Sequence, residues 1–339
     1  MNGGASARAV ALVLASACTN TDPPRPTPAP PASAESHRGD AGHVPPASAV
    51  RDATPPTPDA SSPSADGLDP FRTALPESAK SIGHTSVVFK LKLAGGRTAA
   101  WKPRSKRGND RYKGEIAAYR LGLALGLSNV PPAIPREVSL AAMTRAVGDP
   151  GSDAARLLRE EAIPDEGGNV RGALIPWIDH LGFAPLETTK PEWRGWLSPG
   201  GAVPPEKRQL AADISTMLVF DYLTANWDRW SGGNIGQDPA TGRLLFIDND
   251  GAFFERPPPE PLAGMRRQLE GVGHFSRGLV GKLRSLDLAA LAAAMGDERP
   301  GRPLLPASVL SGVMLRKTEV LSIVDALLAK RPDAGLDID

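Results

Sequence analysis

Four acidic and amide side chains lie close together in the sequence and have the types that phosphoryl transfer requires. Asp228 follows a long helical pattern, Asn234 comes six residues later, and Asp248 and Asp250 follow a short apolar run. In such a set one carboxylate can accept the proton of an attacking hydroxyl, while an amide and a second carboxylate hold a divalent metal against phosphate oxygens. The spacing therefore indicates a phosphoryl-transfer site.

A lysine and a glutamate upstream extend this pattern. Lys102 ends a predicted strand and Glu115 opens the next predicted helix. Protein-kinase-like folds have the same order of parts: a strand lysine, a helix glutamate, an Asp/Asn loop and a metal-binding aspartate. Each residue alone has a simpler interpretation. Lys102 could be a solvated strand end, Glu115 could complement the positive end of a helix dipole, and Asp228 could form a weak surface ion pair with Arg229.

The composition excludes several other classes of protein. The chain has 339 residues, 41% of them apolar, which is enough for a substantial core. The 39 basic and 38 acidic residues leave a net charge of +1, which argues against nucleic-acid binding because that requires a basic surplus. A single cysteine, Cys18, excludes a disulfide scaffold, a cysteine-based zinc cluster and an iron–sulfur site.

The first 70 residues predict an export signal and a tether. Residues 1–18 contain Arg8, an apolar run from Ala9 to Leu14, and small residues before Cys18. This resembles a bacterial lipobox, in which the cysteine is acylated; an ordinary secretory signal and an Ala-rich start are the alternatives. Residues 19–70 contain 13 prolines and no aromatic residue, which is typical of a disordered tether. We therefore expect an exported lipoprotein, anchored to a membrane through its N-terminal lipid only and facing the periplasm or the cell exterior.

The elements that position the candidate site follow from residue patterns. We expect a hairpin over 86–102 with a turn at Gly95-Gly96, because both arms alternate and are rich in β-formers. Residues 115–127 predict a helix that ends at 130–132 and buries one face; its members are Ile116, Tyr119, Leu123 and Leu127. Residues 145–170 read as a polar excursion and 172–178 as a strand or an interdomain crossing. Further along the chain we expect a Trp-containing loop (185–205), a long helix (206–225), two short strands (234–236 and 244–248) and helices over 276–329.

At this point the sequence resembles the four-jointed and Golgi-casein-kinase type of secretory-pathway kinases. Four stretches carry the resemblance, and they are 80–91, 100–106, 112–132 and 220–229 with 247–249. The resemblance implies an α+β, bilobal protein-kinase-like fold over 71–331, with a tail at 332–339. A small β-rich N-lobe with one key helix would span about 71–172, and a mainly helical C-lobe about 178–331. Three departures stand out: Trp230-Ser231 replaces a histidine pair, the body has no cysteine, and Asp250 has no assigned counterpart.

The resemblance also implies residue roles. Asp228 would be the catalytic base, Lys102 would pair with nucleotide phosphates, and Glu115 would position Lys102 or share in metal binding. Asp248 would hold the metal. Beyond the resemblance, we expect Asn234, which lies six residues after Asp228, to be a second metal ligand, and Asp250 could be an extra one. The remaining nucleotide-binding residues would lie in the phosphate-covering loop and the hinge, and they are Ser81, Gly83, His84, Thr85, Leu174, Ile175 and Trp177.

The implied activity is an extracytoplasmic kinase that transfers the γ-phosphoryl group of ATP, with Mg or Mn, to a hydroxyl of a protein or glycan acceptor. The alternative is a pseudokinase that serves as a membrane-tethered nucleotide- or partner-binding module. The loop that contains Trp193 and Trp196 either contacts an acceptor or covers the C-terminal lobe.

Overall fold

An antiparallel five-stranded sheet forms the base of the N-terminal lobe. In a computed structural model, which describes residues 67–83, 86–331 and 335–338, the strand order is β1-β2-β3-β5-β4. A short helix α1 (Asp69–Thr73) precedes the sheet. The strands are β1 (Pro76–Ser81), β2 (Phe89–Leu93), β3 (Arg97–Pro103), β4 (Ile134–Ser139) and β5 (Asn169–Pro176). Because β5 pairs with both β3 and β4, residues 172–176 of the predicted segment belong to a central strand of one sheet, and residues 177 and 178 follow that strand.

The predicted hairpin is confirmed as β2 and β3. Gly95 and Gly96 both have positive φ angles, 81° and 77°, which glycine adopts at little steric cost, and with Ala94 they form the three-residue turn between Leu93 and Arg97. The first strand begins at Phe89 and not at Ser86. Every second residue of β2 is buried, so the alternation seen in the sequence reflects one face on the core and one toward solvent.

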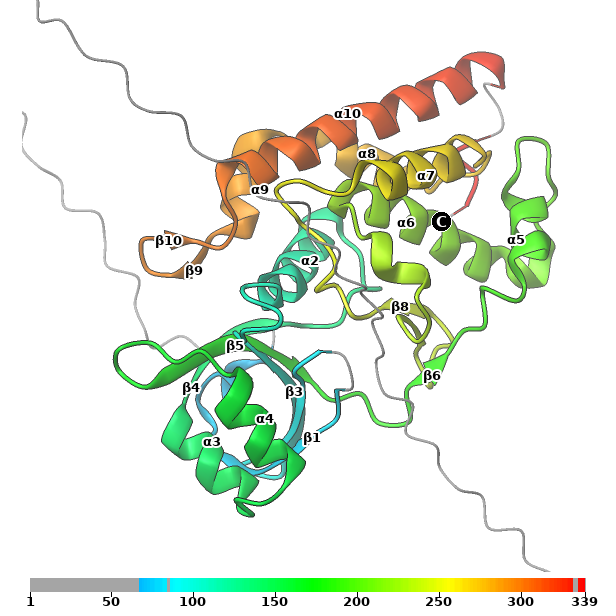
Figure 1. The fold of residues 1–339 in the computed structure, drawn as a ribbon. Coiled ribbons are helices and arrows are strands. Elements are labelled where there is room, and N and C mark those ends of the chain that lie inside the picture. The colour runs from blue at the N-terminus through cyan, green and yellow to red at the C-terminus, as the bar shows by residue number, and fades with distance from the viewer. Residues whose placement is uncertain (1–66, 84–85, 332–334, 339) are drawn as a thin grey trace, which may run out of the picture. The chain divides into compact units, whose positions relative to one another are not determined.

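Helix α2 (Tyr112–Leu125) carries Glu115 and packs between the sheet and the C-terminal lobe (Figure 1). It ends earlier than predicted, because Gly126 adopts a left-handed conformation (φ 71°) and its N–H caps the carbonyls of Gly122 and Leu123. The predicted apolar face is wrong in one member. Leu123 is 59% exposed, whereas Leu121 and Leu125 are buried beside Ile116.

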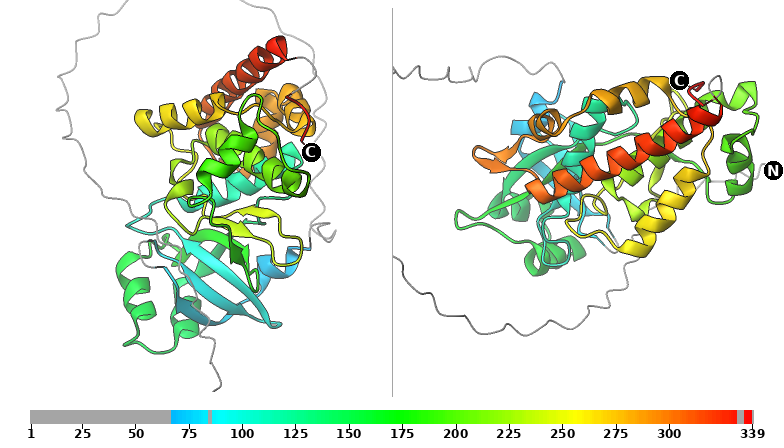
Figure 2. Two further views of the ribbon diagram at one scale, coloured as in Figure 1. Left: turned by 90° about the vertical axis from the view of Figure 1, so that its right-hand side faces the viewer. Right: turned by 90° about the horizontal axis from the view of Figure 1, so that it is seen from above.

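The polar stretch 145–170 is not an irregular excursion. It contains all of α4 (Asp153–Glu161) and the end of α3 (Leu140–Val147). Ser139 and Ser152 cap these helices by accepting hydrogen bonds from Ala142 N and Ala155 N, at 3.1 and 3.2 Å. The apolar positions are few but share one face of each helix. The polar composition of the segment therefore gave no indication of these two short amphipathic helices in the sequence. Both helices pack against the edge strands of the sheet (Figure 2).

The C-terminal lobe is mainly helical and surrounds α6, which is buried on nearly all sides. Its helices are α5 (Lys190–Leu197), α6 (Arg208–Thr224), α7 (Pro259–Glu270), α8 (Arg277–Ser285), α9 (Leu288–Met295) and α10 (Ala307–Lys330), with 3-10 turns η1 (Pro205–Lys207) and η2 (Trp227–Trp230). Its strands are β6 (Gly182–Phe183), β7 (Ile235–Gln237) and β8 (Leu244–Phe246), in that order in one sheet, and the hairpin β9 (Asp297–Arg299) and β10 (Arg302–Pro303).

Two segments of this lobe differ from the sequence prediction. The Trp-containing loop includes helix α5, and Trp193 is buried at 2% exposure with its indole N–H donating to Leu186 O. Trp193 therefore covers the lobe, while Trp196 is half-buried. In the tail, Ile338 is 2% exposed and Phe275 N donates to Gly335 O at 2.7 Å, so residues 335–338 pack against the fold.

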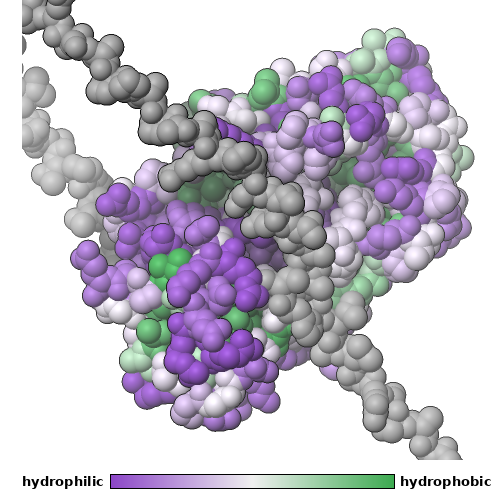
Figure 3. Space-filling model, viewed as in Figure 1, coloured by the Kyte–Doolittle hydropathy of each residue, from purple (hydrophilic) through white to green (hydrophobic). Residues whose placement is uncertain are grey.

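The surface in the view of Figure 3 is covered mostly by hydrophilic side chains, with small scattered apolar spots. Within the described ranges, no helix combines the length and apolarity that a membrane span would need. Cys18 and the predicted signal and tether lie outside the described residues, apart from the last few residues of the tether.

Candidate active site

Lys102 brings the two lobes together through carboxylates. It lies at the end of β3, and its Nζ donates to Glu115 of α2 and to Asp248 Oδ1, 2.5 Å away, just after β8. The exposed fraction is only 4% for Lys102, 4% for Glu115 and 5% for Asp248. Burial lowers the pKa of Lys102, but the surrounding carboxylates outweigh it and the net pKa is raised, so the lysine is charged. The interpretation of Lys102 as a solvated strand end is therefore wrong.

Asp248 has a strained backbone. Its φ is 55°, a left-handed value that is unfavourable for any residue with a side chain. The next residue holds this turn, because Asn249 N donates to Glu115 Oε1 at 3.0 Å and Asn249 Nδ2 donates to Phe246 O at 2.8 Å. Asn249 thus ties Glu115 to the strand end that presents Asp248. No local pattern in the sequence indicates this role of Asn249.

Asp228 lies in the η2 turn that follows α6. Ala225 ends α6 in a left-handed conformation (φ 53°), and the chain turns there into η2. Asp228 is 3% exposed, and burial raises the pKa of its carboxyl, with Asp248 adding to the effect. Gly251 is required beside it, since a Cβ at Gly251 would lie 2.9 Å from Asp228 Cβ. The segment after Asp248 therefore passes directly over the predicted base.

Asn234 is held by the same turn. Its Nδ2 donates to Asp228 O at 2.9 Å and to Ser231 Oγ at 3.1 Å, which leaves its buried Oδ1 without a hydrogen-bond partner. The predicted residues Asp228 and Asn234 are thus fixed relative to each other through the backbone. The six-residue interval is accommodated by Gly232 and Gly233, both at positive φ.

Arg229 does not form a surface ion pair with Asp228, as one interpretation of the sequence had it. It is fully buried, and its guanidinium donates to both carboxylate oxygens of Asp221 in α6, at 2.9 to 3.1 Å. It also donates to Asn234 O at 2.8 Å, to Ile247 O, and to the side chain of Asn249 at 2.7 Å. One side chain therefore joins α6, the turn that contains Asp228 and the strand end before Asp248.

Asp250 lies at the edge of this cluster. Arg111, which precedes α2, donates to Asp250 Oδ1 at 2.7 Å and to its carbonyl oxygen at 3.1 Å, and Lys102 Nζ lies 3.7 Å from Asp250 Oδ2. Burial raises the pKa of Asp250 to about 6, against the opposing effects of Lys102 and Arg111. The negative charge of Asp250 therefore offsets part of the positive charge of Lys102 and Arg111.

The predicted nucleotide-binding residues border β3. Ser81 ends β1 and Gly83 lies in the connection to β2, where a Cβ would collide with Ser86 O, so this loop is tightly turned. His84 and Thr85 lie outside the described residues. Leu174 and Ile175 of β5 pair with Trp101 and Ala100 of β3; Leu174 is buried, and Ile175 and Trp177 are half-buried.

A divalent metal needs oxygen ligands that other groups do not already occupy. Among the described residues, no three His, Cys, Asp or Glu side chains form a preformed metal cluster. Both oxygens of Glu115 already accept hydrogen bonds from Lys102 and Asn249. Asp248 Oδ2 and Asn234 Oδ1, however, are buried oxygens without hydrogen-bond partners. One carboxylate and one amide oxygen suit Mg or Mn when phosphates and water supply the other ligands, so these two residues fit such an ion.

A second contact between the lobes holds the N-terminal end of α2. Glu298, in the β9–β10 hairpin, accepts hydrogen bonds from Tyr112 Oη and from Arg171 Nη1, the latter at 3.3 Å, and pairs with Lys113 Nζ, also at 3.3 Å. Its side chain is only 4% exposed. The hairpin thus fastens the start of α2, three residues before Glu115, to the C-terminal lobe.

We expect Glu298→Gln to loosen α2. The amide keeps the shape of the side chain but removes the charge that Lys113 and Arg171 face, which costs about 1–3 kcal/mol. Urea unfolding should show this loss of stability, and hydrogen exchange should show faster exchange in α2. Glu137→Gln is the matched control, because its contact with Arg299 spans 3.7 Å between half-exposed side chains. Equal effects of the two variants would contradict the role given to Glu298.

The fold and the convergence of these side chains define a bilobal, kinase-like α+β protein. No model of a known protein family matches the sequence, and no curated protein does. Among solved structures, the Golgi casein kinase matches with a TM-score of 0.58 and 15% identity over 80% of this chain and 78% of that one. Its complex with Mn and ADP gives 0.57 and 14%, over 79% and 77%. Hydra Fam20 with sugar gives 0.57 and 17%, over 79% and 89%.

Proposed function

We propose that this protein is a kinase that transfers the γ-phosphoryl group of ATP to a hydroxyl of a protein or glycan acceptor. The observation that carries the proposal is the convergence of Lys102 and Glu115 from one lobe with Asp248 from the other, beside the turn that holds Asp228 and Asn234. The solved structures of similar fold lend support, because one contains Mn and ADP and another contains a sugar. Because these structures share only 14–17% sequence identity with this chain, the likeness concerns the fold alone.

In the proposed reaction each residue has a separate task. The ammonium of Lys102, positioned by Glu115, binds phosphate oxygens of ATP. Asp228 accepts the proton as the acceptor oxygen bonds to the γ-phosphorus and the bond between that phosphorus and the bridging oxygen of ADP breaks. A divalent ion held by Asp248 and Asn234, with Asp250 nearby, would neutralise charge on the phosphates when bound. Burial raises the pKa of Asp228, which makes its carboxylate a better proton acceptor.

Nucleotide contacts would come from the loop after β1 and from the end of β5. Ser81 and Gly83, with His84 and Thr85, would cover the phosphates from the loop after β1. The hinge would be formed by Leu174, Ile175 and Trp177, because the end of β5 adjoins the strand that carries Lys102. Backbone groups beyond Leu174, where the pairing of β5 with β4 stops, can bind an adenine ring, and half-buried apolar side chains can cover its faces.

The proposal is tested with purified protein, γ-labelled ATP, and Mg or Mn, in the presence and absence of a chelator. We expect metal-dependent transfer of label to a subset of proteins or oligosaccharides, or to water when no acceptor is present. Stabilisation by nucleotide and metal without any turnover would instead favour the tethered binding module. Nucleotide at a hundred times its Kd should raise the unfolding free energy by about 2.7 kcal/mol. The absence of both turnover and stabilisation would overturn both functions.

We also propose that the protein is exported and held at a membrane by a lipid on Cys18, with residues 19–70 as the tether. The supporting observations are the small residues before Cys18 and the proline content of the segment that follows. Cys18→Ser is expected to move the protein from the membrane fraction to the soluble fraction of cells that express it, because Cys18 is the only cysteine in the chain. Fractionation followed by detection of the protein measures this. Retention of Cys18→Ser in the membrane fraction would count against lipid anchoring.

A further inference from the structure

The face of the N-terminal sheet that carries Lys102 also carries a row of neighbouring side chains. The strand register places four residues directly opposite one another from β1 to β5, and they are Lys80, Lys90, Ala100 and Ile175. Directly opposite residues point to the same face of a sheet, and Lys102 shares that face because it follows Ala100 by two residues. Lys102 contacts Asp248 of the C-terminal lobe, so the proposed nucleotide would lie on this face.

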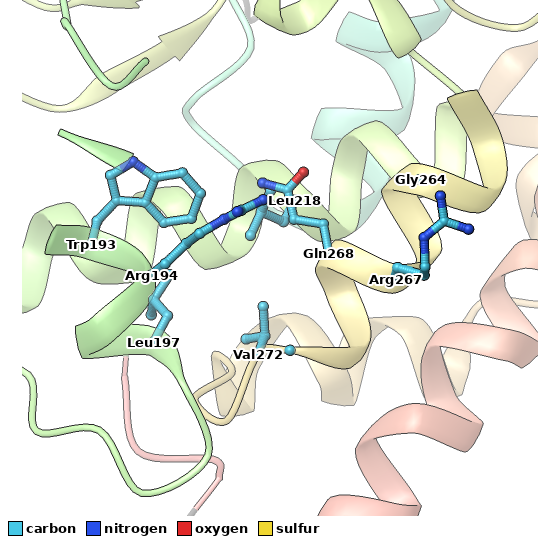
Figure 4. Close-up of a pocket in the computed structure, with 9 residues that line it drawn as sticks. Trp193, Arg194, Leu197, Leu218, Gly264, Arg267, Gln268 and Val272 are labelled. Atoms are coloured by element: carbon cyan, nitrogen blue, oxygen red, sulfur yellow. The ribbon is translucent and has the colours of Figure 1, made fainter. Parts of the chain in front are cut away.

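Ala100 and Ile175 form an apolar floor on this face. Both side chains are half-buried, whereas the opposite face of the same strands is covered, with Trp101 and Leu174 at 0% and 1% exposure. The pocket of about 430 Å³ between α5 and α7 lacks such a surface (Figure 4), because the apolar side chains that line it are at most 6% exposed. A flat ring on the floor would therefore bury apolar area that the fold leaves open.

The two lysines that border this floor have no carboxylate partner among the described residues. Lys80 is exposed, and the half-buried Lys90 holds its Nζ 3.7 Å from the ring centroid of Trp177, just after β5. Like charges directly opposite each other in a sheet are unfavourable. An ammonium offers three donors and no acceptor, so the two side chains favour a ligand that presents acceptor atoms to them.

Of the two common purines, guanine suits a pair of donors better than adenine does. Guanine has two adjacent acceptors, O6 and N7, on one edge, where adenine has the acceptor N7 beside its N6 amino donor. A lysine that donates to O6 and N7 is accordingly a common specific contact to guanine. The apolar floor suits either ring, so the lysines would determine the preference between the two bases.

We propose that the nucleotide site binds guanine nucleotides at least as tightly as adenine nucleotides, and that Lys90 is the residue that selects the base. The ammonium groups of Lys90 and Lys80 donate to O6 and N7 of guanine, and the ring lies on Ala100 and Ile175. Ala100 precedes Lys102 by about 7 Å along β3, which lets the phosphates extend from the floor toward the Lys102 ammonium. The inference rests on the proposed nucleotide-binding function and deepens it by naming the base.

The experiment is isothermal titration calorimetry of the full chain with Mn and either GDP or ADP. We expect the Kd of GDP to be equal to or below that of ADP. Lys90→Met should weaken GDP binding about tenfold and change ADP binding by less than about twofold, because methionine keeps the aliphatic stem but donates no hydrogen bond. Lys92→Met is the matched control and should change neither affinity. It makes the same substitution on the same strand and face, at an exposed position two residues nearer the hairpin turn.

Lys90→Arg provides the conservative comparison, since a guanidinium also donates to O6 and N7, and GDP binding should persist in this variant. Binding of ADP without binding of GDP would overturn the inference and leave the proposed nucleotide site in place. Equal weakening of GDP and ADP by Lys90→Met would also overturn it, because Lys90 would then not select the base. Binding of neither nucleotide would contradict the proposed kinase function itself and this inference with it.

Discussion

Asp228→Asn is expected to lower the turnover number for phosphoryl transfer by about 10²–10⁴-fold. Asparagine has nearly the shape of aspartate but cannot accept the proton of the acceptor hydroxyl. The backbone of the η2 turn should persist, because Asn234 Nδ2 bonds to the carbonyl oxygen of residue 228 and not to its side chain. Binding of nucleotide and metal should also persist, since Lys102 and Asp248 are unchanged.

The measurement is the initial rate of label transfer from γ-labelled ATP, together with nucleotide-induced thermal stabilisation of the same variant. Glu166→Gln is the matched control, because it makes the same carboxylate-to-amide change at an exposed position far along the chain from the cluster. Turnover of Asp228→Asn equal to that of Glu166→Gln would remove Asp228 from the reaction. Loss of both turnover and stabilisation would show that the substitution disturbs the site as a whole.

Arg229→Met is expected to destabilise the fold by about 3–5 kcal/mol. Methionine fills much of the same volume but leaves the Asp221 carboxylate, with a side-chain exposure of 5%, buried without its partner. Burial already raises the pKa of Asp221, and Arg229 opposes that rise. The substitution also removes the donors to Asn234 O, Ile247 O and the side chain of Asn249, so the two segments that carry Asp228 and Asp248 lose their shared anchor.

Urea or thermal unfolding measures this effect, and Arg266→Met is the matched control. Arg266 pairs with Glu270 and Glu319, but its side chain is 49% exposed, so its removal should cost about 1 kcal/mol or less. Replacing Asp221 and Arg229 together by Leu and Met should recover part of the loss, because no buried charge then remains unpaired. A cost for Arg229→Met no greater than that for Arg266→Met would contradict the anchoring role.

Local patterns in the sequence were sufficient to predict much of the secondary structure. The hairpin at Gly95-Gly96 and the helices around Glu115 and Asp221 follow from alternation, turn glycines and helical periodicity, which depend on neighbouring residues. Predictions were wrong where tertiary packing selects among equivalent local choices. Leu123 fits the apolar face of its helix but is 59% exposed, whereas Leu121 and Leu125 of the same helix belong to the core.

The partners of charged residues could not be predicted for a similar reason. Arg229 is next to Asp228 in the sequence, yet its guanidinium turns toward Asp221, one helix turn and a loop earlier. Glu298 is 186 residues from Tyr112, and no local pattern indicates that they meet. Such contacts depend on how the lobes are docked, and no short window of sequence contains that information.

The sequence by itself determined which chemical groups are present and in which order: a strand lysine, a helix glutamate, and an aspartate and asparagine before a second aspartate. It also determined the bilobal α+β class through its resemblance to known kinases. Only the tertiary structure decided that Lys102, Glu115 and Asp248 meet, that Arg229 and Asn249 hold their segments, and that a pocket lies beside Trp193. The physical reason is that burial, hydrogen-bond partners and pKa shifts depend on distances between residues far apart in the chain, which packing alone sets.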